Sequence, residues 1–232
     1  MFPPDLVRTA RVAGGLYFIV ILCGIGAEAA LRGPLVDLAD PAGTAEAIRN
    51  APLRFRAGLA ADLAMGLADV GLAIGLYRLF RPVSAALAQA ATAFRLVQAA
   101  IIGASLLTLQ AAALLLDGSG AAALPPEPVS MAMLFLALHA SGYDIALAFF
   151  GINAFLTGAL ILRFGWLPRL LGWAVIAAGG VYLAGAFLRV LAPALASGFA
   201  PAYAIPVLAE SAFCLALLLA RRSRDETKGS RR

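Results

Sequence analysis

The chain carries ionisable side chains in stretches that are otherwise apolar enough to lie in lipid. The clearest case is LFLALHASGYDIALAFFGINAFL, residues 134–156, which holds Asp144 and the chain's only histidine, His139. A charged side chain at the centre of a membrane costs about 2.5–3.5 kcal/mol on insertion scales, so each one needs a partner or a function. These groups are the first candidates for a functional site.

Two aspartates and an arginine form the first candidate network. Asp62 and Asp69 share one face of a predicted helix with small residues, which lets a neighbouring helix approach closely. In an antiparallel hairpin turning near residue 80, Arg95 falls at a depth between the two acids, so we expect it to contact Asp62 or Asp69. The full candidate network is Glu28, Asp62, Asp69, Arg95 and Gln98.

A second candidate group lies mainly on the helix predicted over 129–162. His139, Tyr143 and Asn153 fall on one side of it. Asp144 falls on another side with Gly151 and Gly158, where we expect a close helix contact, so His139 and Asp144 are poorly placed to pair. With Glu210 from the last apolar segment, the group comprises His139, Tyr143, Asp144, Asn153 and Glu210.

Two interpretations of these groups stay open. Buried polar side chains can serve only as interhelical hydrogen bonds, or they can bind or move an ion or small molecule. The sequence contains no HExxH, no phosphate-binding P-loop and no GxSxG motif. One histidine is too few for a typical zinc site, so we predict no metal and no cofactor. Cys23 and Cys214 lie in apolar runs and have no metal-binding spacing.

The composition identifies the elements that must position these residues. The chain has 232 residues, of which 62% are hydrophobic and 13% charged. Soluble domains average roughly 45–50% and 25%, so this is an integral membrane protein. We predict an all-α bundle of six transmembrane helices, each containing the roughly 20 apolar residues that a span requires, at 11–32, 55–79, 82–116, 129–162, 170–190 and 201–220.

The distribution of basic residues predicts the orientation. Twelve lie at one set of segment ends: Arg8, Arg11, Arg78, Arg81, Arg163, Arg169, Arg221, Arg222, Arg224, Lys228, Arg231 and Arg232. The opposite ends hold five: Arg32, Arg49, Arg54, Arg56 and Arg189. The positive-inside rule then places both termini in the cytoplasm, in a multi-pass protein of the bacterial inner membrane. The basic residues form no single patch, which argues against nucleic-acid binding.

Several local expectations complete the layout. Residues 1–220 are predicted to form one transmembrane domain, followed by a disordered basic cytoplasmic tail at 221–232. The loop 33–56 is expected to hold a short amphipathic helix that opens at TAEAI. Pro206 is expected to kink the last span. One alternative treats the first span as a signal peptide cleaved near AEA, residues 27–29.

Three segments resemble a known family. They are TARVAGGLYFIVILCGIGAEAALR, LFRPVSAALAQAATAFRLVQAAIIG and the stretch from LHASGYD to GGVYL. The FRLVQA block, the LH…GY block and the RFGWLPRLLG turn resemble the bacterial family known as domain of unknown function 4386. The resemblance spans roughly residues 8–220 and implies a small polytopic membrane protein, with no activity attached. It favours a retained first span, and Asp144 departs from it because an uncharged residue is expected after the GY pair.

Three classes of function follow from these expectations. The favoured one is a non-enzymatic membrane protein, a sensor or minor transporter, whose polar network binds or conducts a small molecule or ion. The alternatives are an intramembrane enzyme acting on a lipid-like substrate, with His139 or an acid as general base, and a structural partner of another membrane protein. Membrane lipids are the expected surroundings in every case.

Overall fold

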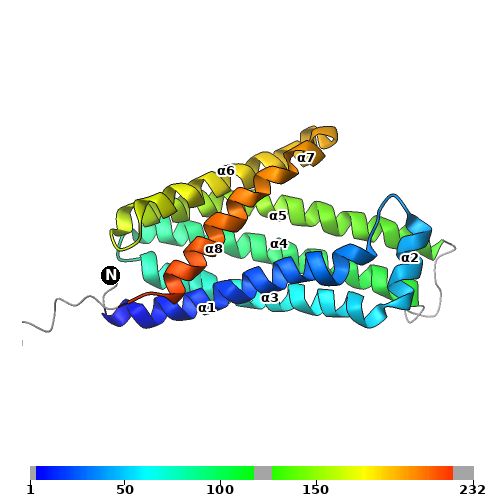
Figure 1. Cartoon of the computed structure of the whole chain (residues 1–232), viewed down its shortest axis with the longest axis horizontal. Helices are drawn as coiled ribbons and strands as arrows, with labels where there is room; N and C mark the ends of the chain where they lie inside the picture. The colour runs from blue at the N-terminus through cyan, green and yellow to red at the C-terminus, as the bar shows by residue number, and fades with distance from the viewer. Residues whose placement is uncertain (1–3, 118–126, 222–232) are drawn as a thin grey trace, which may run out of the picture. The chain divides into compact units, whose positions relative to one another are not determined.

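A computed structural model describes residues 4–117 and 127–221, and within these ranges every regular element is a helix (Figure 1). In chain order the elements are α1 (Pro4–Gly26), the π-helical segment η1 (Ala27–Arg32), the 3-10 turn η2 (Gly33–Leu35), α2 (Pro41–Asn50), α3 (Pro52–Phe80), α4 (Ala85–Asp117), α5 (Pro128–Phe164), α6 (Arg169–Leu191), α7 (Pro193–Phe199), the 3-10 turn η3 (Ala200–Tyr203) and α8 (Ala204–Leu218).

Six helical stretches of the described chain are long and apolar enough to cross a membrane. They are Leu6–Leu35, Pro52–Phe80, Ala85–Asp117, Pro128–Phe164, Arg169–Leu191 and Ala200–Leu218. The predicted all-α fold with six membrane-spanning helices is therefore confirmed. The cytoplasmic location of both termini and the single domain over 1–220 stay predictions, and the expected tail lies outside the described residues except for Arg221.

Proline sets several helix starts. α2, α3, α5 and α7 begin at Pro41, Pro52, Pro128 and Pro193, where the fixed φ suits the first turn and the missing N–H removes no helical hydrogen bond. Pro206 is the third residue of α8, so it also lies in a first turn. It follows the point at which the 3-10 turn η3 gives way to α-helix, and the kink expected at Pro206 stays a prediction.

The short helix expected in the loop 33–56 is present as α2, but it begins earlier than TAEAI indicated. Asp40 is the N-cap, and its carboxylate accepts a hydrogen bond of 3.0 Å from the Gly43 amide. Thr44, the expected cap, instead donates its hydroxyl proton to the Asp37 carbonyl at 2.8 Å. Asp40 therefore caps α2 in place of Thr44.

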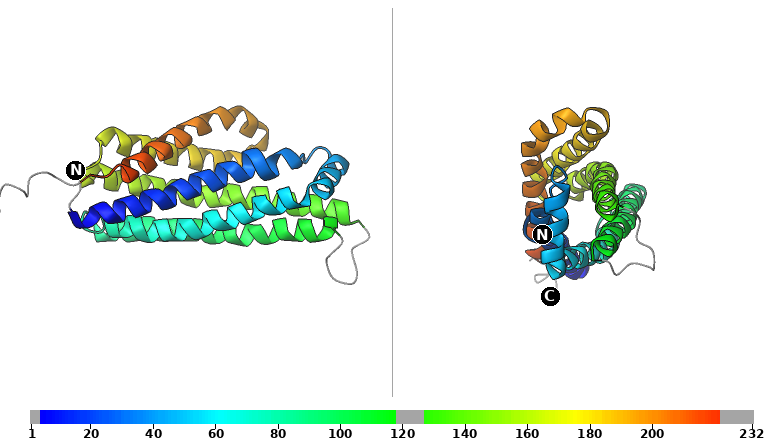
Figure 2. Two further views of the ribbon diagram at one scale, coloured as in Figure 1. Left: turned by 60° about the horizontal axis from the view of Figure 1, so that its bottom comes forward. Right: turned by 90° about the vertical axis from the view of Figure 1, so that its right-hand side faces the viewer.

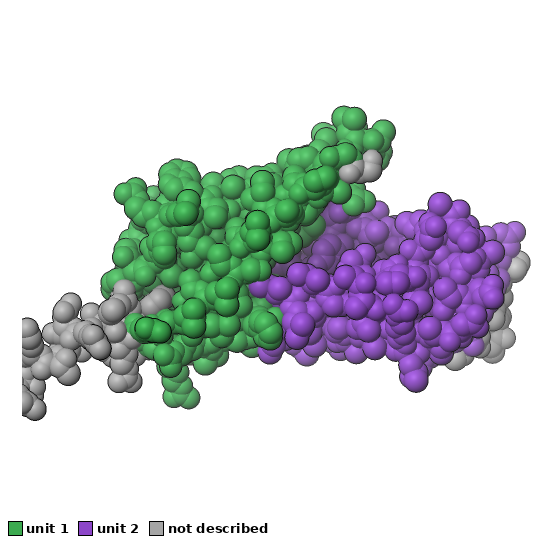
Figure 3. Space-filling view, in the orientation of Figure 1, with its two compact units in different colours: residues 1–18, 69–96, 147–232 green, residues 19–68, 97–146 purple. Residues whose placement is uncertain are grey.

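The described chain forms two compact units, drawn in different colours in Figure 3. Of the described residues, unit 1 comprises 4–18, 69–96 and 147–221, and unit 2 comprises 19–68, 97–117 and 127–146. The helices α1, α3, α4 and α5 each contribute residues to both units.

In unit 2, α2 packs on α3, α4 and α5 through one apolar core. Phe55 and Leu109 are each 1% exposed, and Ile48 of α2 joins the same cluster. α2 runs across the direction of the neighbouring part of α3 (Figures 1 and 2). Burying an apolar face of this kind stabilises a short helix that has little stability alone.

In unit 1, α5 and α6 approach each other through two pairs of glycines. A Cβ atom added at Gly151 would lie 2.9 Å from the Gly179 carbonyl oxygen, and one added at Gly158 would lie 2.7 Å from that of Gly172. Such contacts permit only hydrogen at the α-carbon, as is common where membrane helices touch. The close contact predicted for Gly151 and Gly158 is therefore present. Alongside, α6 and α8 lie side by side (Figure 1).

α3 illustrates the inverted polarity of a membrane span. Its outward stripe consists of large apolar side chains, with Leu63, Leu67 and Ile74 exposed by 53%, 70% and 49%. Its aspartates, Asp62 and Asp69, are only 2% and 4% exposed. Apolar residues facing outward and acids facing inward suit a helix surrounded by lipid rather than by water.

Candidate functional site

The polar centre of unit 1 is an ion pair between α3 and α4. Nε and Nη2 of Arg95 both donate to Oδ1 of Asp69, at 2.8 and 2.5 Å. The two side chains are 3% and 5% exposed. This is the contact that the hairpin geometry predicted, and each group keeps the other's charge compensated away from water.

Aromatic rings cover the Arg95 guanidinium. Its central carbon lies 5.3 Å from the ring centre of Tyr17 and 5.0 Å from that of Phe150, within the range of cation–π contacts. Asn153 accepts a long hydrogen bond of 3.5 Å from Arg95 Nη1 and donates to the Ala91 carbonyl at 2.7 Å. Salt bridge, rings and amide together hold this arginine in one position.

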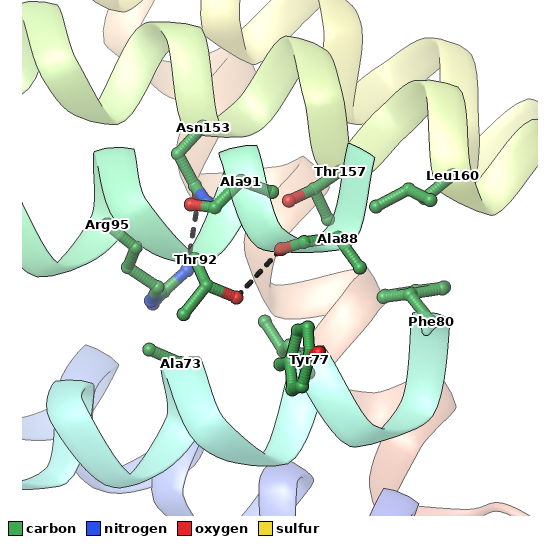
Figure 4. Close-up of a pocket in the computed structure, with 11 residues that line it drawn as sticks. Ala73, Tyr77, Phe80, Ala88, Ala91, Thr92, Arg95, Asn153, Thr157 and Leu160 are labelled. Carbon is green, nitrogen blue, oxygen red and sulfur yellow. Dashed lines mark hydrogen bonds between the residues drawn. The ribbon is translucent and has the colours of Figure 1, made fainter. Parts of the chain in front are cut away.

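Two small cavities adjoin Arg95 within unit 1. Each has a volume of about 10 Å³, close to the minimum that holds a single water molecule. Figure 4 shows the first, into which Thr92, Asn153 and Thr157 bring polar atoms. Glu210 lines the second and accepts a short hydrogen bond from the Tyr182 hydroxyl. Each cavity can therefore hold one water molecule at most and is too small for an organic ligand.

The polar centre of unit 2 is built around Arg32, which lies at the end of the π-helical segment η1. The Gly33 amide donates to the carbonyl of Glu28, five residues earlier. A Cβ at Gly33 would lie 2.0 Å from that carbonyl oxygen, so only glycine fits this turn. A second glycine, Gly58 of α3, faces Arg32. A Cβ added at Gly58 would lie 3.1 Å from the Arg32 Cβ, so the absence of a side chain allows this close approach. The two glycines thereby bring Arg32 against α3, with its side chain only 8% exposed.

Arg32 has three neighbours that bear on its charge. Nη2 donates to Oε2 of Glu28 at 2.7 Å and lies 3.5 Å from Oδ2 of Asp62. Nη1 lies 2.7 Å from Nε2 of His139. Because a guanidinium has no lone pair to accept with, it must donate to an unprotonated Nε2.

This contact fixes the form of His139. With Nε2 unprotonated, the ring proton lies on Nδ1, which donates to the Ser105 carbonyl at 3.2 Å. His139 is therefore neutral in this arrangement, and both of its nitrogens are occupied. The Tyr143 ring centre lies 6.3 Å from the imidazole centre.

Asp62 is the least satisfied member of the cluster. Its Oδ2 is buried and accepts no hydrogen bond from the described residues, and Nε of Arg32 is buried and donates to none of these residues. Burying a polar atom without a partner costs about 1–3 kcal/mol, so such atoms in a folded protein call for an explanation.

The structure regroups the predicted residues. Asp69, Arg95, Asn153 and Glu210 lie in unit 1, and Glu28, Asp62, Gln98, His139, Tyr143 and Asp144 lie in unit 2. Asp62 pairs with Arg32 rather than with Arg95. Gln98 is buried and Asp144 is half-buried. Among the described residues, no three His, Cys, Asp or Glu side chains gather to hold a metal ion.

Three contributors were not identified from the sequence. Arg32 looked like an ordinary basic residue at a span end, and the only signal against this was the adjacent Gly33-Pro34. Ser105 contributes a backbone carbonyl, which any residue type provides. Tyr182 was not among the predicted site residues, yet its hydroxyl donates to the Glu210 carboxylate.

Comparison with known proteins gives a family and no activity. Residues 12–220 match the family model described as Domain of unknown function (DUF4386). An uncharacterized protein of Archaeoglobus fulgidus is 30% identical over 121 residues, which cover 52% of this chain and 60% of that protein. The chain thus spans less than two thirds of that relative. No solved structure matches.

Proposed function

The chain belongs to the family Domain of unknown function (DUF4386), and we propose that it is an inner-membrane protein that binds a proton at the buried carboxylate of Asp62. It would act as a sensor of proton concentration or as a minor transporter. The observation that carries the proposal is the Oδ2 atom of Asp62, which is buried beside Arg32 and accepts no hydrogen bond from the part of the chain that the structure describes.

The charges of the unit 2 cluster support proton binding. Arg32 supplies one positive charge against the carboxylates of Glu28 and Asp62, while the neutral His139 supplies none. The Glu28 side chain is 70% exposed and takes the short contact with Arg32, whereas Asp62 is 2% exposed. The uncompensated negative charge therefore falls on the buried acid, where charge is most costly.

A proton suits this site better than a larger cation. It neutralises the carboxylate without extra ligands, whereas a metal ion needs several oxygen atoms around it. The positive charge of Arg32 also repels a metal ion that approaches Asp62. Glu28 provides an exposed entrance, because its carboxylate shares Nη2 of Arg32 with Asp62.

The enzyme alternative finds less support in the geometry. A general base needs a lone pair that can reach a substrate. The Nε2 lone pair of His139 is occupied by Arg32, and Nδ1 carries the proton that bonds the Ser105 carbonyl.

Infrared difference spectroscopy of the protein in liposomes tests the proposal. Acidification should produce a carboxylic C=O band in the wild type that disappears in Asp62→Asn. The control Glu46→Gln removes an exposed acid on α2 and should keep the band. Asp62→Asn with an unchanged band would refute Asp62 as the proton site. A pH-sensitive dye inside the same liposomes then separates the two roles, because only a transporter would lose internal pH change in Asp62→Asn.

A further inference from the structure

A further cavity lies in unit 2, where α2 meets the start of α3 and the end of α4. Its volume is about 330 Å³, at the lower end of the range for small-molecule sites. Its lining includes Arg49, Pro52, Phe55, Arg56, Leu116 and Asp117. None of them belongs to the cluster around Asp62.

One side of the cavity carries a net positive charge. Nε of Arg49 donates to the Leu116 carbonyl at 3.1 Å, and Nη2 of Arg56 donates to Oδ2 of Asp117 at 2.6 Å. Each guanidinium has five N–H donors, so both retain donors for another group. Two arginines and one aspartate leave one positive charge, which matches a singly charged anion such as a phosphodiester.

The other side is apolar. Its apolar lining residues are Ile48, Pro52, Phe55, Ala113 and Leu116, and Pro52 is the exposed member of this set. A purely ionic ligand would gain nothing from this surface, whereas the first carbons of an alkyl chain would. The cavity thus combines requirements that an anionic amphiphile meets.

We propose that this cavity binds the phosphate head group of an anionic membrane phospholipid, with Arg49 and Arg56 on the phosphate and the glycerol end of the lipid against Pro52. The volume accommodates a head group and the start of a chain, and the rest of the lipid lies in the surrounding bilayer. Lipid binding here is independent of proton binding at Asp62.

Native mass spectrometry of the protein in mild detergent tests the site, with phosphatidylglycerol and phosphatidylcholine as competing probes. The wild type should retain phosphatidylglycerol preferentially. The double variant Arg49→Gln, Arg56→Gln should bind it about tenfold more weakly or worse, since two charge-assisted contacts are lost. Arg54→Gln is the matched control, because Arg54 donates to the Ala30 carbonyl and does not line the cavity.

Three outcomes would overturn the proposal. They are equal retention of both lipids by the wild type, unchanged retention in the double variant, and displacement of phosphatidylglycerol by inorganic phosphate alone, which would indicate a free-anion site. If the double variant does not fold, Arg56→Gln carries the test, because the Arg56 side chain is 56% exposed and its loss disturbs the core least.

Discussion

At the scale of residues, the two arginines differ in how completely they are satisfied. Arg95 has a carboxylate at 2.5 Å and two aromatic ring centres, of Tyr17 and Phe150, at 5.3 and 5.0 Å from its central carbon. Arg32 divides its donors among Glu28, His139 and the more distant Asp62, and its Nε has no hydrogen-bond partner within residues 4–117 and 127–221. The cluster around Arg95, whose polar groups are hydrogen-bonded, suits a role in holding the helices together. The cluster around Arg32, which keeps unsatisfied polar atoms, suits exchange of a proton.

This difference predicts unequal effects of neutralising the two aspartates. Asp69→Asn leaves Arg95 buried without its counterion and should destabilise the protein by roughly 3–5 kcal/mol. Asp62→Asn should cost far less, because Arg32 keeps Glu28 and His139. Thermal unfolding in detergent compares the two variants directly. If both variants lost the same stability, or if Asp62→Asn lost more, Asp62 could not be the less satisfied of the two aspartates.

The tautomer of His139 is a second residue-scale prediction. Near neutral pH the ring should be uncharged and protonated on Nδ1, because Arg32 donates to Nε2. The chain has one histidine, so ¹⁵N labelling of histidine gives two ring signals without ambiguity. Arg32→Gln provides the control, since it removes the donor that imposes this tautomer. A protonated Nε2 in the wild type would exclude the contact.

At the scale of elements, close helix contacts depend on single glycines. On α6, Gly179 and Gly180 are neighbours in sequence with opposite surroundings. A Cβ at Gly179 would lie 2.7 Å from the Gly151 carbonyl oxygen, whereas one at Gly180 meets only the tip of the Phe155 ring at 4.0 Å. The contact therefore depends on which face of the helix a glycine occupies.

Alanine substitution at these two positions should give opposite results. Gly179→Ala forces α5 and α6 apart and should cost about 1–3 kcal/mol. Gly180→Ala meets no obstacle and should be neutral or stabilise by up to about 1 kcal/mol, because alanine loses less conformational entropy in a helix. Thermal unfolding of the two variants measures the difference. Similar midpoints would show that α5 and α6 are not in close contact at Gly179.

At the scale of the whole molecule, hydropathy was sufficient to predict the spans, since lipid admits few alternatives to apolar helices. Counting residues from the turn near residue 80 also predicted the Asp69–Arg95 contact, because a helical hairpin has a regular rise. The Arg32–Asp62 contact was missed because it depends on a π-helical turn, which follows no simple periodicity. The start of α2 was misplaced because Asp40 competed successfully with Thr44 as its cap.

The buried position of Arg32 sharpens the predicted orientation in the membrane. Arg32 was counted among five basic residues at one set of ends, but it lies inside the unit 2 cluster with its side chain 8% exposed. Without Arg32, four basic residues lie at one set of helix ends and twelve at the other. The charge asymmetry that predicts cytoplasmic termini is therefore stronger.

Reporter fusions test that orientation. A fluorescent protein fused after Arg232 should be bright, and a phosphatase that needs disulfides should be inactive there, because disulfides form only on the oxidising side. Fusions after Asn50 should reverse both readings, and fusions after Arg81 should restore them. An active phosphatase at the C-terminus would invert the topology. Glu28 lies near the helix ends that would then face the cytoplasm, as does the cavity at Arg49 and Arg56. The same result would therefore also reverse the side of the membrane from which protons reach Asp62.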